Sequence, residues 1–354
     1  MGETPLSAAE GALVSTIYSP PQAHRPWMLK DILPEGAVKF YALARWALVD
    51  GLRACGVSAG DCVMVPGLIC REVLASINCV GATPAFYPVS PQLCAGFDPG
   101  VLGQSKAVLA VNYFGFPQEL GRFRQYCERT GAVLIEDNAH GLLSRDENGQ
   151  LLGSRGDIGI FSFRKTIAVP AGGALVLNGG QITPPDLSSI SALSTRYRLK
   201  QAFRPVTRQL GAPVTLGALE MFRHVRRLLT GHAVPRSLPD AEEHVPAPPN
   251  PCELISGPLT VAVPALEASR RRALFDLAAR LVNGSSAVPV FERLPDHVVP
   301  YGYPLFASPA RAPALAATLR RHGLSLVPWP DLPAAIAPSA PEHYRDLMVV
   351  PFLW

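Results

Sequence analysis

The chain has 354 residues, of which 48% are hydrophobic and 17% charged, and its formal net charge is +4. This composition predicts a compact globular protein and excludes a disordered one, and a net charge this small gives no reason to expect nucleic-acid binding. The sequence shows neither a signal peptide nor an apolar run of membrane-spanning length, so we expect a cytoplasmic protein without a membrane partner.

The cysteines do not form a recognisable framework. There are seven, and none forms a C-x-x-C pair. An odd count without framework spacing favours buried free thiols in a reducing compartment over disulfides. No group of Cys and His residues has the spacing of zinc ligands, so no metal site is expected.

The first half of the chain alternates predicted helices and strands. A proline-rich, irregular N-terminal arm is expected over residues 1–36. Beyond it, the apolar periodicity predicts helices at 38–55, 72–80 and 118–130, and strands at 62–66, 84–89, 107–111, 132–140, 158–163 and 173–177. This alternation predicts an α/β fold in which helices cover both faces of a mostly parallel central sheet.

The second half is expected to hold a smaller α+β domain. Helices are predicted at 210–229, 266–281 and 312–321, and strands at 288–291 and 303–306. The proline-rich segment 246–251 is taken as a hinge, which gives a large domain of residues 1–245 and a small domain of residues 246–354. The basic run 223–227 would suit a membrane surface, but we favour a solvated helix face or a subunit contact.

Two polar side chains follow buried predicted strands. Lys165 comes just after the strand at 158–163, and Asp137 ends the apolar part of the strand at 132–140. In parallel sheets, ligands bind at the carboxyl ends of the strands. A lysine that condenses with an aldehyde and an aspartate that pairs with a pyridinium nitrogen suit pyridoxal phosphate, PLP. The alternatives are a structural lysine and an aspartate that caps a helix or joins an ion pair.

Four sequence segments occur in an order typical of one enzyme family. They are Ala47–Pro66, Gly81–Pro84, Ile135–His140 and Gly153–Phe163. Together they resemble the DegT/DnrJ/EryC1/StrS family of PLP-dependent aminotransferases, in a divergent branch. The resemblance implies the PLP-transferase fold type I, a homodimer, and catalytic roles for Lys165 as the Schiff-base residue and Asp137 as the partner of the ring nitrogen.

The spacing of the lysine departs from the family pattern. The family usually places it four residues after the F-S-F segment, where this chain has Ile167, whereas Lys165 lies two residues after Phe163. Counted back from Gly172 and Gly173, Lys165 has the family spacing. A two-residue deletion reconciles the two counts, and the alternative is a displaced structural lysine in a turnover-dead relative.

The resemblance assigns other positions to the cofactor. His140 matches the residue near the pyridoxal hydroxyl, and Ser162 matches a phosphate-contacting serine. Ala44 and Arg45 replace the family's Gly-Thr phosphate loop, where backbone N–H groups at a helix start and the Arg45 guanidinium would bind phosphate. Cys70 stands where most relatives stack an aromatic side chain on the pyridine ring. For each of these positions, a purely structural role is the alternative.

The resemblance also implies a reaction. Asn112 and Tyr113 match the family's substrate-side loop, with ordinary turn chemistry as the alternative. The expected activity is transfer of an amino group from an amino acid, glutamate by family resemblance, to a keto acceptor such as a nucleotide-linked keto sugar in polysaccharide or secondary-metabolite biosynthesis. Two alternatives stay open. One is a PLP-fold dehydratase or lyase. Lys165 counts against it, because family members that catalyse elimination carry histidine at this position. The other is a turnover-dead scaffold or sensor.

Overall fold

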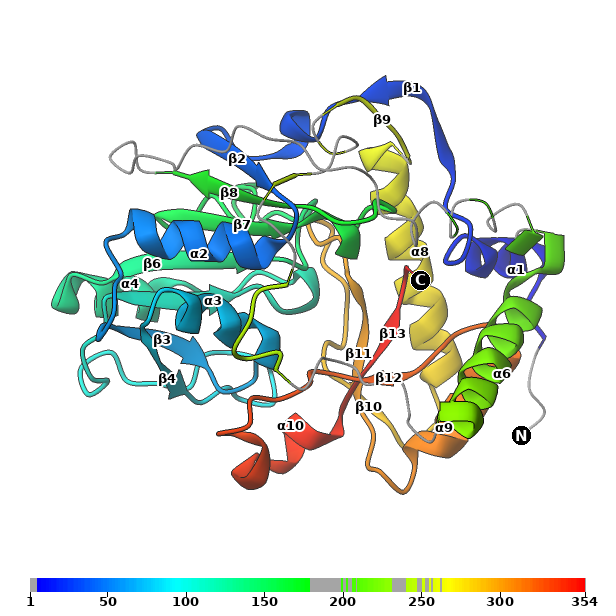
Figure 1. Ribbon diagram of the computed structural model, residues 1–354. Helices are drawn as coiled ribbons and strands as arrows, with labels where there is room; N and C mark the ends of the chain where they lie inside the picture. Colours follow the sequence, from blue (N-terminus) through cyan, green and yellow to red (C-terminus); the bar gives the residue numbers. More distant parts are fainter. Residues whose placement is uncertain are drawn as a thin grey trace.

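The computed structural model describes residues 5–178, 199, 202, 206–207, 209–230, 240–246, 250–251, 255, 257–261 and 263–353 (Figure 1). A seven-stranded sheet lies at the centre of its larger part, with the strand order β2-β8-β7-β6-β5-β3-β4. These strands are β2 (Ala37–Tyr41), β3 (Cys62–Pro66), β4 (Thr83–Tyr87), β5 (Ala107–Val111), β6 (Val133–Asn138), β7 (Ile158–Ser162) and β8 (Gly173–Leu177).

Five neighbouring strands of this sheet form parallel pairs. They are β7, β6, β5, β3 and β4, while β8 pairs antiparallel with β7 and β2 pairs antiparallel with β8. Every residue of β5, β7 and β8 is buried, as strands covered on both faces require. The prediction of a mostly parallel central sheet is therefore confirmed.

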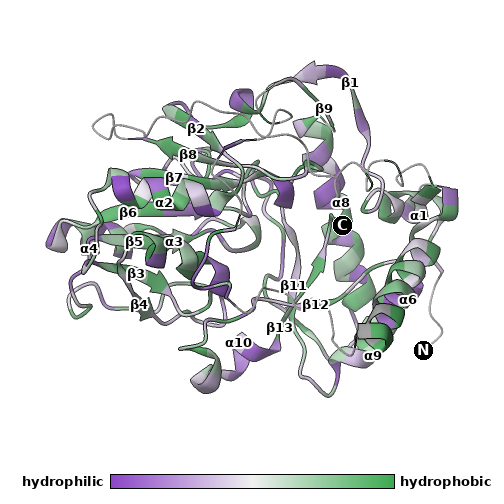
Figure 2. Cartoon of the chain, viewed as in Figure 1, coloured by the Kyte–Doolittle hydropathy of each residue, from purple (hydrophilic) through white to green (hydrophobic). Residues whose placement is uncertain are grey.

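Different elements cover the two faces of the sheet at β7. Helix α2 (Ala44–Ala54) lies on one face, where Gly51 allows close approach to Ile158 and Ile160. The alternate strand residue, Phe161, joins a second apolar cluster on the other face, together with Leu29 and Leu259. Helices α3 (Leu74–Cys79) and α4 (Gly121–Thr130) complete the packing around the parallel strands. Figure 2 shows hydrophobic residues along the strands of the central sheet and hydrophilic ones on the outer sides of α2 and α4.

Two predictions for the N-terminal part are wrong. Residues 38–55 form strand β2 followed by helix α2, because the first of these residues pair with β8. The described part of the predicted irregular arm 1–36, residues 5–36, is not irregular, since it includes helix α1 (Ala8–Ser15), strand β1 (Gln22–Trp27) and the 3-10 turn η1 (Leu29–Ile32). Strand β1 pairs antiparallel with β9 (Leu259–Val261), and α1 packs against a helix of the C-terminal part.

That C-terminal part combines helices with a smaller sheet. The helices are α8 (Pro264–Val282), α9 (Ala312–Arg321) and α10 (Glu342–Asp346), with the 3-10 turn η5 (Ala337–Ser339) before α10. The sheet has the order β10-β11-β13-β12, formed by β10 (Val288–Pro289), β11 (Gly302–Phe306), β12 (Val327–Pro328) and β13 (Leu347–Pro351). The predicted helices and strands here are present, while β12, β13, η5 and α10 were not foreseen. The boundary at residue 246 stays a prediction, and residues 247–249 of the hinge lie outside the described chain.

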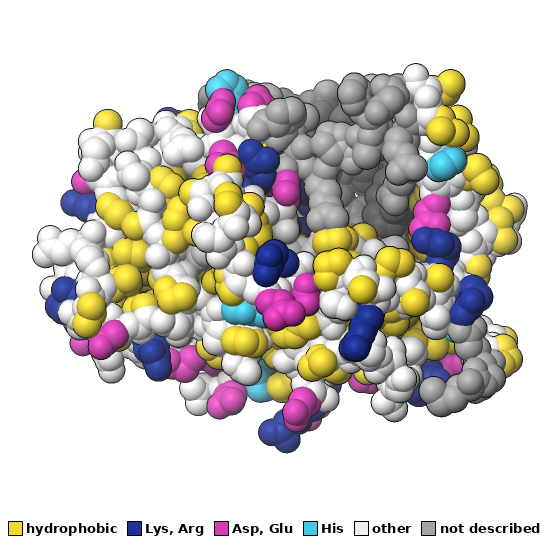
Figure 3. Space-filling view, turned by 90° about the horizontal axis from the view of Figure 1, so that it is seen from below, with side chains coloured by type: hydrophobic (Ala, Val, Ile, Leu, Met, Phe, Trp, Pro, Cys, Tyr) yellow, Lys and Arg dark blue, Asp and Glu magenta, His cyan; other side chains and the backbone are white. Residues whose placement is uncertain are grey.

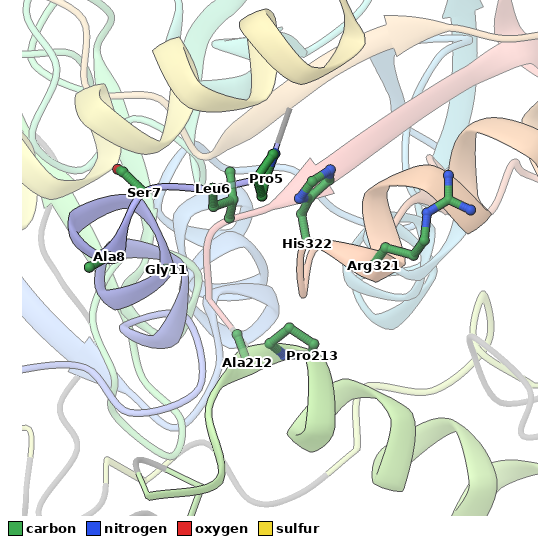
Figure 4. A pocket seen from close by; sticks show the side chains of 9 residues that line it. All are labelled: Pro5, Leu6, Ser7, Ala8, Gly11, Ala212, Pro213, Arg321 and His322. Atoms are coloured by element: carbon green, nitrogen blue, oxygen red, sulfur yellow. The ribbon is translucent and has the colours of Figure 1, made fainter. Parts of the chain in front are cut away.

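Helix α6 (Ala212–Thr230) lies beside α1 and α9 at the edge of the molecule (Figure 1). A cavity opens where Pro5, Leu6, the start of α6 and the end of α9 meet, with His322 and Arg321 on one side (Figure 4). The described lining of this cavity shows no set of polar groups that converge on one point.

The surface charges and the cysteines do not point to a functional site. On the face shown in Figure 3, basic and acidic side chains are interspersed rather than gathered by sign. Within the described residues, no helix combines the length and apolarity needed to cross a membrane.

The six described cysteines are free, but Cys79 and Cys94 are exposed, so the expectation of buried thiols is wrong for these two. Cys252 lies outside the described residues.

Candidate active site

Lys165 and Asp137 meet at the carboxyl ends of adjacent parallel strands. Strand β7 ends at Ser162, and the 3-10 turn η4 (Phe163–Lys165) carries the lysine beyond it. Asp137 is the penultimate residue of β6 and pairs in register with Ile160 of β7. Both side chains line the same two adjoining cavities, as does Ala139. The fold therefore brings together the two residues that the sequence singled out.

The amine of Lys165 is hydrogen-bonded to a histidine of defined tautomer. The Nε2 atom of His140 lies 3.1 Å from Lys165 Nζ, while the backbone N–H of Phe114 donates to His140 Nδ1 at 3.2 Å. Because Nδ1 accepts a hydrogen bond, the proton of the neutral ring is on Nε2. In this tautomer the Nε2–H group faces the Lys165 amine, whose side chain is of the kind that condenses with an aldehyde.

His140 is suited to remaining neutral. Burial lowers its pKa well below the ordinary value, and the positive charges that Lys165 and Arg271 can carry add to this shift. Its ring stacks on that of Tyr301, with centroids 4.3 Å apart and planes at 8°. Tyr301 also donates its backbone N–H to the carbonyl of Phe114 at 2.8 Å. This packing fixes the imidazole plane opposite the lysine.

Phe114 adopts an unusual backbone conformation to reach His140. It lies in the 3-10 turn η3 (Tyr113–Gly115) with φ of 56°, a left-handed conformation that costs a bulky residue about 1–2 kcal/mol. Its fully buried side chain packs on Trp329, with ring centroids 4.8 Å apart, which helps to hold this geometry. Strained residues of this kind cluster at functional sites.

Asp137 presents a carboxylate to the cavity. One of its oxygens accepts the backbone N–H of Ala139 at 2.9 Å. Burial raises the pKa of this carboxyl, while the charge of Lys165 and the Ala139 N–H oppose that rise. A buried carboxylate is stabilised when it pairs with a buried cationic N–H group. Asp137 would hold a protonated ring nitrogen in this way.

A second carboxylate, next to Asp137 in the sequence, points away from the cavity and is fully paired. Glu136 has no exposed surface, and Arg155 donates to it through Nε at 2.8 Å and through its backbone N–H at 2.9 Å. Asn112 donates to Glu136 at 2.8 Å and accepts from Arg155 at 2.8 Å. This network fixes the end of β6, and sequence reasoning missed it.

Asn112 and Tyr113, which were predicted to bind substrate, use their polar side-chain atoms in hydrogen bonds to other residues of the chain. The amide of Asn112 is used in the network with Glu136, and the hydroxyl of Tyr113 donates to the carbonyl of Leu68 at 2.8 Å. Both residues still line the cavity that holds Lys165. Their contact with substrate stays a prediction.

Two arginines line the second of the two adjoining cavities that Lys165 and Asp137 share. Arg45 and Arg164 line it together with Ser162 and the start of α2 at Ala44. Burial lowers the pKa of the Arg45 guanidinium, the carboxylate of Glu72 opposes the shift, and the charge of Arg164 adds to it. The first N–H groups of a helix have no intrahelical partner. Two cations, a hydroxyl and free N–H groups together make a site for an anion. Arg164 was not foreseen because its role depends on the turn before Lys165.

Cys70 lies at the junction of the two cavities and precedes the 3-10 turn η2 (Arg71–Val73). Burial raises the pKa of its thiol to about 11, and the charge of Lys165 opposes that rise. At neutral pH the group is therefore an uncharged thiol, which packs against a ligand rather than attacking it. Among the described residues, no group of three or more His, Cys, Asp or Glu side chains is placed to hold a metal ion.

Comparison with known proteins gives the site a context. Residues 44–188 match the sequence model of the DegT/DnrJ/EryC1/StrS aminotransferase family. An L-glutamine:2-deoxy-scyllo-inosose aminotransferase of Streptoalloteichus tenebrarius is 33% identical over 38% of this chain and 33% of its own length. A UDP-N-acetyl-3-dehydro-alpha-D-glucosamine 3-aminotransferase of Acidithiobacillus ferrooxidans is 32% identical over 40% of this chain and 38% of its own. The matched stretch thus spans little more than a third of these curated relatives.

Solved structures match along nearly the whole chain. The aminotransferase TlmJ from Streptoalloteichus hindustanus superposes with a TM-score of 0.59 and 17% identity, covering 98% of this chain and 91% of that one. The PLP form of the sugar aminotransferase Spr1654 from Streptococcus pneumoniae gives 0.58 and 16%, covering 99% and 92%. Because identity is this low, these matches show that the chain shares its fold with these aminotransferases.

Proposed function

Because residues 44–188 match the sequence model of the DegT/DnrJ/EryC1/StrS aminotransferase family, we propose that the protein is a PLP-dependent aminotransferase. The observation that carries the proposal is the cavity shared by Lys165 and Asp137, in which the lysine amine is hydrogen-bonded to His140. An amine held beside a buried carboxylate is what covalent capture of an aldehyde-bearing pyridine cofactor requires.

The residues around the cavity fit PLP at three points. Lys165 would hold its aldehyde carbon, Asp137 its ring nitrogen, and Ser162 with Arg45 its phosphate. When bound, PLP supplies an aldehyde that exchanges between amines and a ring that withdraws electrons from the attached carbon. The neutral thiol of Cys70 leaves an uncharged surface beside the space for the ring.

Each side chain then has a defined task. The Lys165 amine acts as general base and acid, taking a proton from the α-carbon of the amino donor and returning it at the cofactor carbon. The carboxylate of Asp137 keeps the ring nitrogen protonated. His140, neutral and fixed by the Phe114 N–H and the Tyr301 ring, directs the lysine toward the reacting atoms.

The substrates follow from chemistry that the relatives share. Their names describe transfer of nitrogen to inososes and keto sugars, in several cases from L-glutamine. We therefore infer a keto sugar or cyclitol as the acceptor, and L-glutamate or L-glutamine as the donor. The family resemblance also supports a homodimer, which completes the proposal.

A spectrum of the purified full-length protein tests the proposal. The wild type, supplied with PLP, should show the visible band of the lysine-bound cofactor, and addition of L-glutamate or L-glutamine should bleach it. Lys165→Ala should lose both the band and its bleaching. Lys39→Ala, in the antiparallel strand β2 of the same sheet, is the matched control and should behave as the wild type.

Each outcome is decisive. Borohydride reduction followed by peptide mass spectrometry should place the cofactor on Lys165 and on no other lysine. A wild-type protein that shows no band after addition of PLP would favour a turnover-dead scaffold. A band that the amino donors leave unchanged, together with elimination of water from a sugar substrate, would favour a lyase.

A further inference from the structure

One buried arginine joins the C-terminal part of the chain to the backbone that carries Lys165. Arg271 of α8 has no exposed surface. Its Nη2 donates to the carbonyls of Lys165 at 3.0 Å and of Thr166 at 2.9 Å. These two carbonyls belong to the turn immediately after β7, and their positions determine where the lysine side chain starts.

The other N–H groups of Arg271 are used as well. Nη1 donates to the carbonyls of Pro300 at 3.1 Å and of Tyr301 at 2.9 Å, and Nε donates to Glu267 at 2.7 Å. A guanidinium has five N–H donors, so all five are paired. One rigid, planar group thus fixes the distance between the lysine turn and the segment of Tyr301.

These two segments are the two sides of the hydrogen bond that Lys165 makes. The Tyr301 ring stacks on His140, and Nε2 of His140 is hydrogen-bonded to Nζ of Lys165. Movement of either segment would change the Nε2–Nζ distance of 3.1 Å. We propose that Arg271 is a positioning residue for Lys165, acting through the carbonyls of Lys165 and Thr166 on one side and that of Tyr301 on the other. The inference rests on the proposed function, since it assigns Lys165 its task.

The chain supplies a matched control one residue away. Arg270 is also buried and pairs with the same carboxylate, through Nε to Glu267 at 2.9 Å. Its Nη2 also donates to Glu267 at 2.5 Å, and its other bonds go to Thr16 at 3.1 Å and to the carbonyl of Phe352 at 3.0 Å, so none of these bonds reaches the lysine turn. A purely structural contribution should therefore be similar for both arginines, whereas positioning of the lysine belongs to Arg271.

The test compares Arg271→Lys with Arg270→Lys in the full chain. Lysine keeps the charge for Glu267 but lacks the five-donor fork that holds four carbonyls. The first readout is the rate at which PLP-free protein captures PLP, followed by the visible band and trapped by borohydride. The second is the acetylation rate of Lys165 in PLP-free protein, measured by peptide mass spectrometry against Lys30 and Lys106 of the same molecule. Urea unfolding of each variant fixes the conditions in which both are folded.

We expect PLP capture to slow roughly tenfold in Arg271→Lys, since small misplacement of a reacting group has effects of at least this size. Acetylation of Lys165 should rise in this variant as the side chain leaves His140, and Arg270→Lys should match the wild type on both readouts. Equal behaviour of the two variants would overturn the inference. If the wild type captures no PLP, the proposed function fails, and the acetylation comparison still decides the role of Arg271. Should Arg271→Lys not fold, Arg271→Gln and Arg270→Gln take their places.

Discussion

Arg155 encloses the carboxylate of Glu136, with an N–O distance of 2.5 Å between Nη2 and Oε1 and less than a tenth of either side chain exposed. The pair lies directly behind Asp137 at the end of β6. Glu136 and Asp137 are adjacent at the end of one strand. The Arg155–Glu136 pair therefore helps to hold the Asp137 carboxylate in place at the cavity.

Removal of Arg155 should destabilise the protein strongly. Arg155→Ala leaves the charge of Glu136 buried without its cation, which typically costs 3–5 kcal/mol, so we expect a loss of about 4 kcal/mol in the free energy of unfolding. Urea titration followed by circular dichroism measures this loss. Arg122→Ala is the control, because the exposed Arg122 donates only to the carbonyl of Phe97. A loss below about 1 kcal/mol for Arg155→Ala would contradict the reading of a tightly coupled pair.

Two glycines of similar backbone conformation should respond differently to alanine. Gly149 has φ of 80° with open space around it, while at Gly153, with φ of 89°, an added Cβ would lie 2.2 Å from the Phe161 ring. We expect Gly149→Ala to cost about 1–2 kcal/mol from backbone strain alone. Gly153→Ala should cost at least about 3 kcal/mol, because Phe161 is fully buried in β7 and overpacking adds to the strain. Thermal unfolding of the two variants compares them, and equal losses would show that the ring has room to move.

The two arginines at the anion end of the cavity should matter for the phosphate and not for the ring. Arg45→Gln and Arg164→Gln should each weaken PLP binding about tenfold, since a hydrogen bond to a charged group is worth about 1.5–3 kcal/mol. Pyridoxal, which lacks the phosphate, serves as the matched ligand, and its affinity should change little. Fluorescence titration gives both constants, with Arg122→Gln as the control variant. Parallel losses for PLP and pyridoxal would instead indicate a general disturbance of the cavity.

The buried histidine should make the fold sensitive to acid. The pKa of His140 is held well below its ordinary value by burial. The unfolded chain therefore binds a proton below about pH 6.5 that the folded chain does not. The free energy of unfolding should fall as the pH drops below this value, with a contribution of up to about 1.4 kcal/mol per pH unit. His140→Gln should flatten this dependence between pH 4 and 6.5, while the exposed His24→Gln should leave it unchanged. Identical pH profiles for both variants and the wild type would contradict this assignment.

The parts of the fold with local signals could be predicted from the sequence. Ala107–Val111 and Gly173–Leu177 are apolar runs bounded by turn residues, and both are strands with the predicted bounds. The meeting of Asp137 and Lys165 was also predictable, because both follow buried strands and parallel strands end at the same edge of a sheet.

The missed features depend on contacts between distant segments. Strand β2 was absorbed into a predicted helix because its partner, β8, lies about 130 residues further along the chain. The sequence around Arg271 shows only adjacent arginines on a helix, and nothing local indicates that one of them reaches the carbonyl of Lys165, 106 positions earlier. Tyr301 and Trp329 are likewise ordinary aromatic residues until the fold brings them to His140.

The attachment of the N-terminal arm has a consequence for biosynthesis. Trp27 donates its indole N–H to the carbonyl of Val261, which follows it by 234 positions, and α1 rests on α8, which is later still. A ribosome must therefore release most of the polypeptide before β1 and α1 meet their partners. Until β9 and α8 have been synthesised, β1 and α1 lack their partners. A holdase chaperone or a protease can bind the nascent chain most readily at this stage.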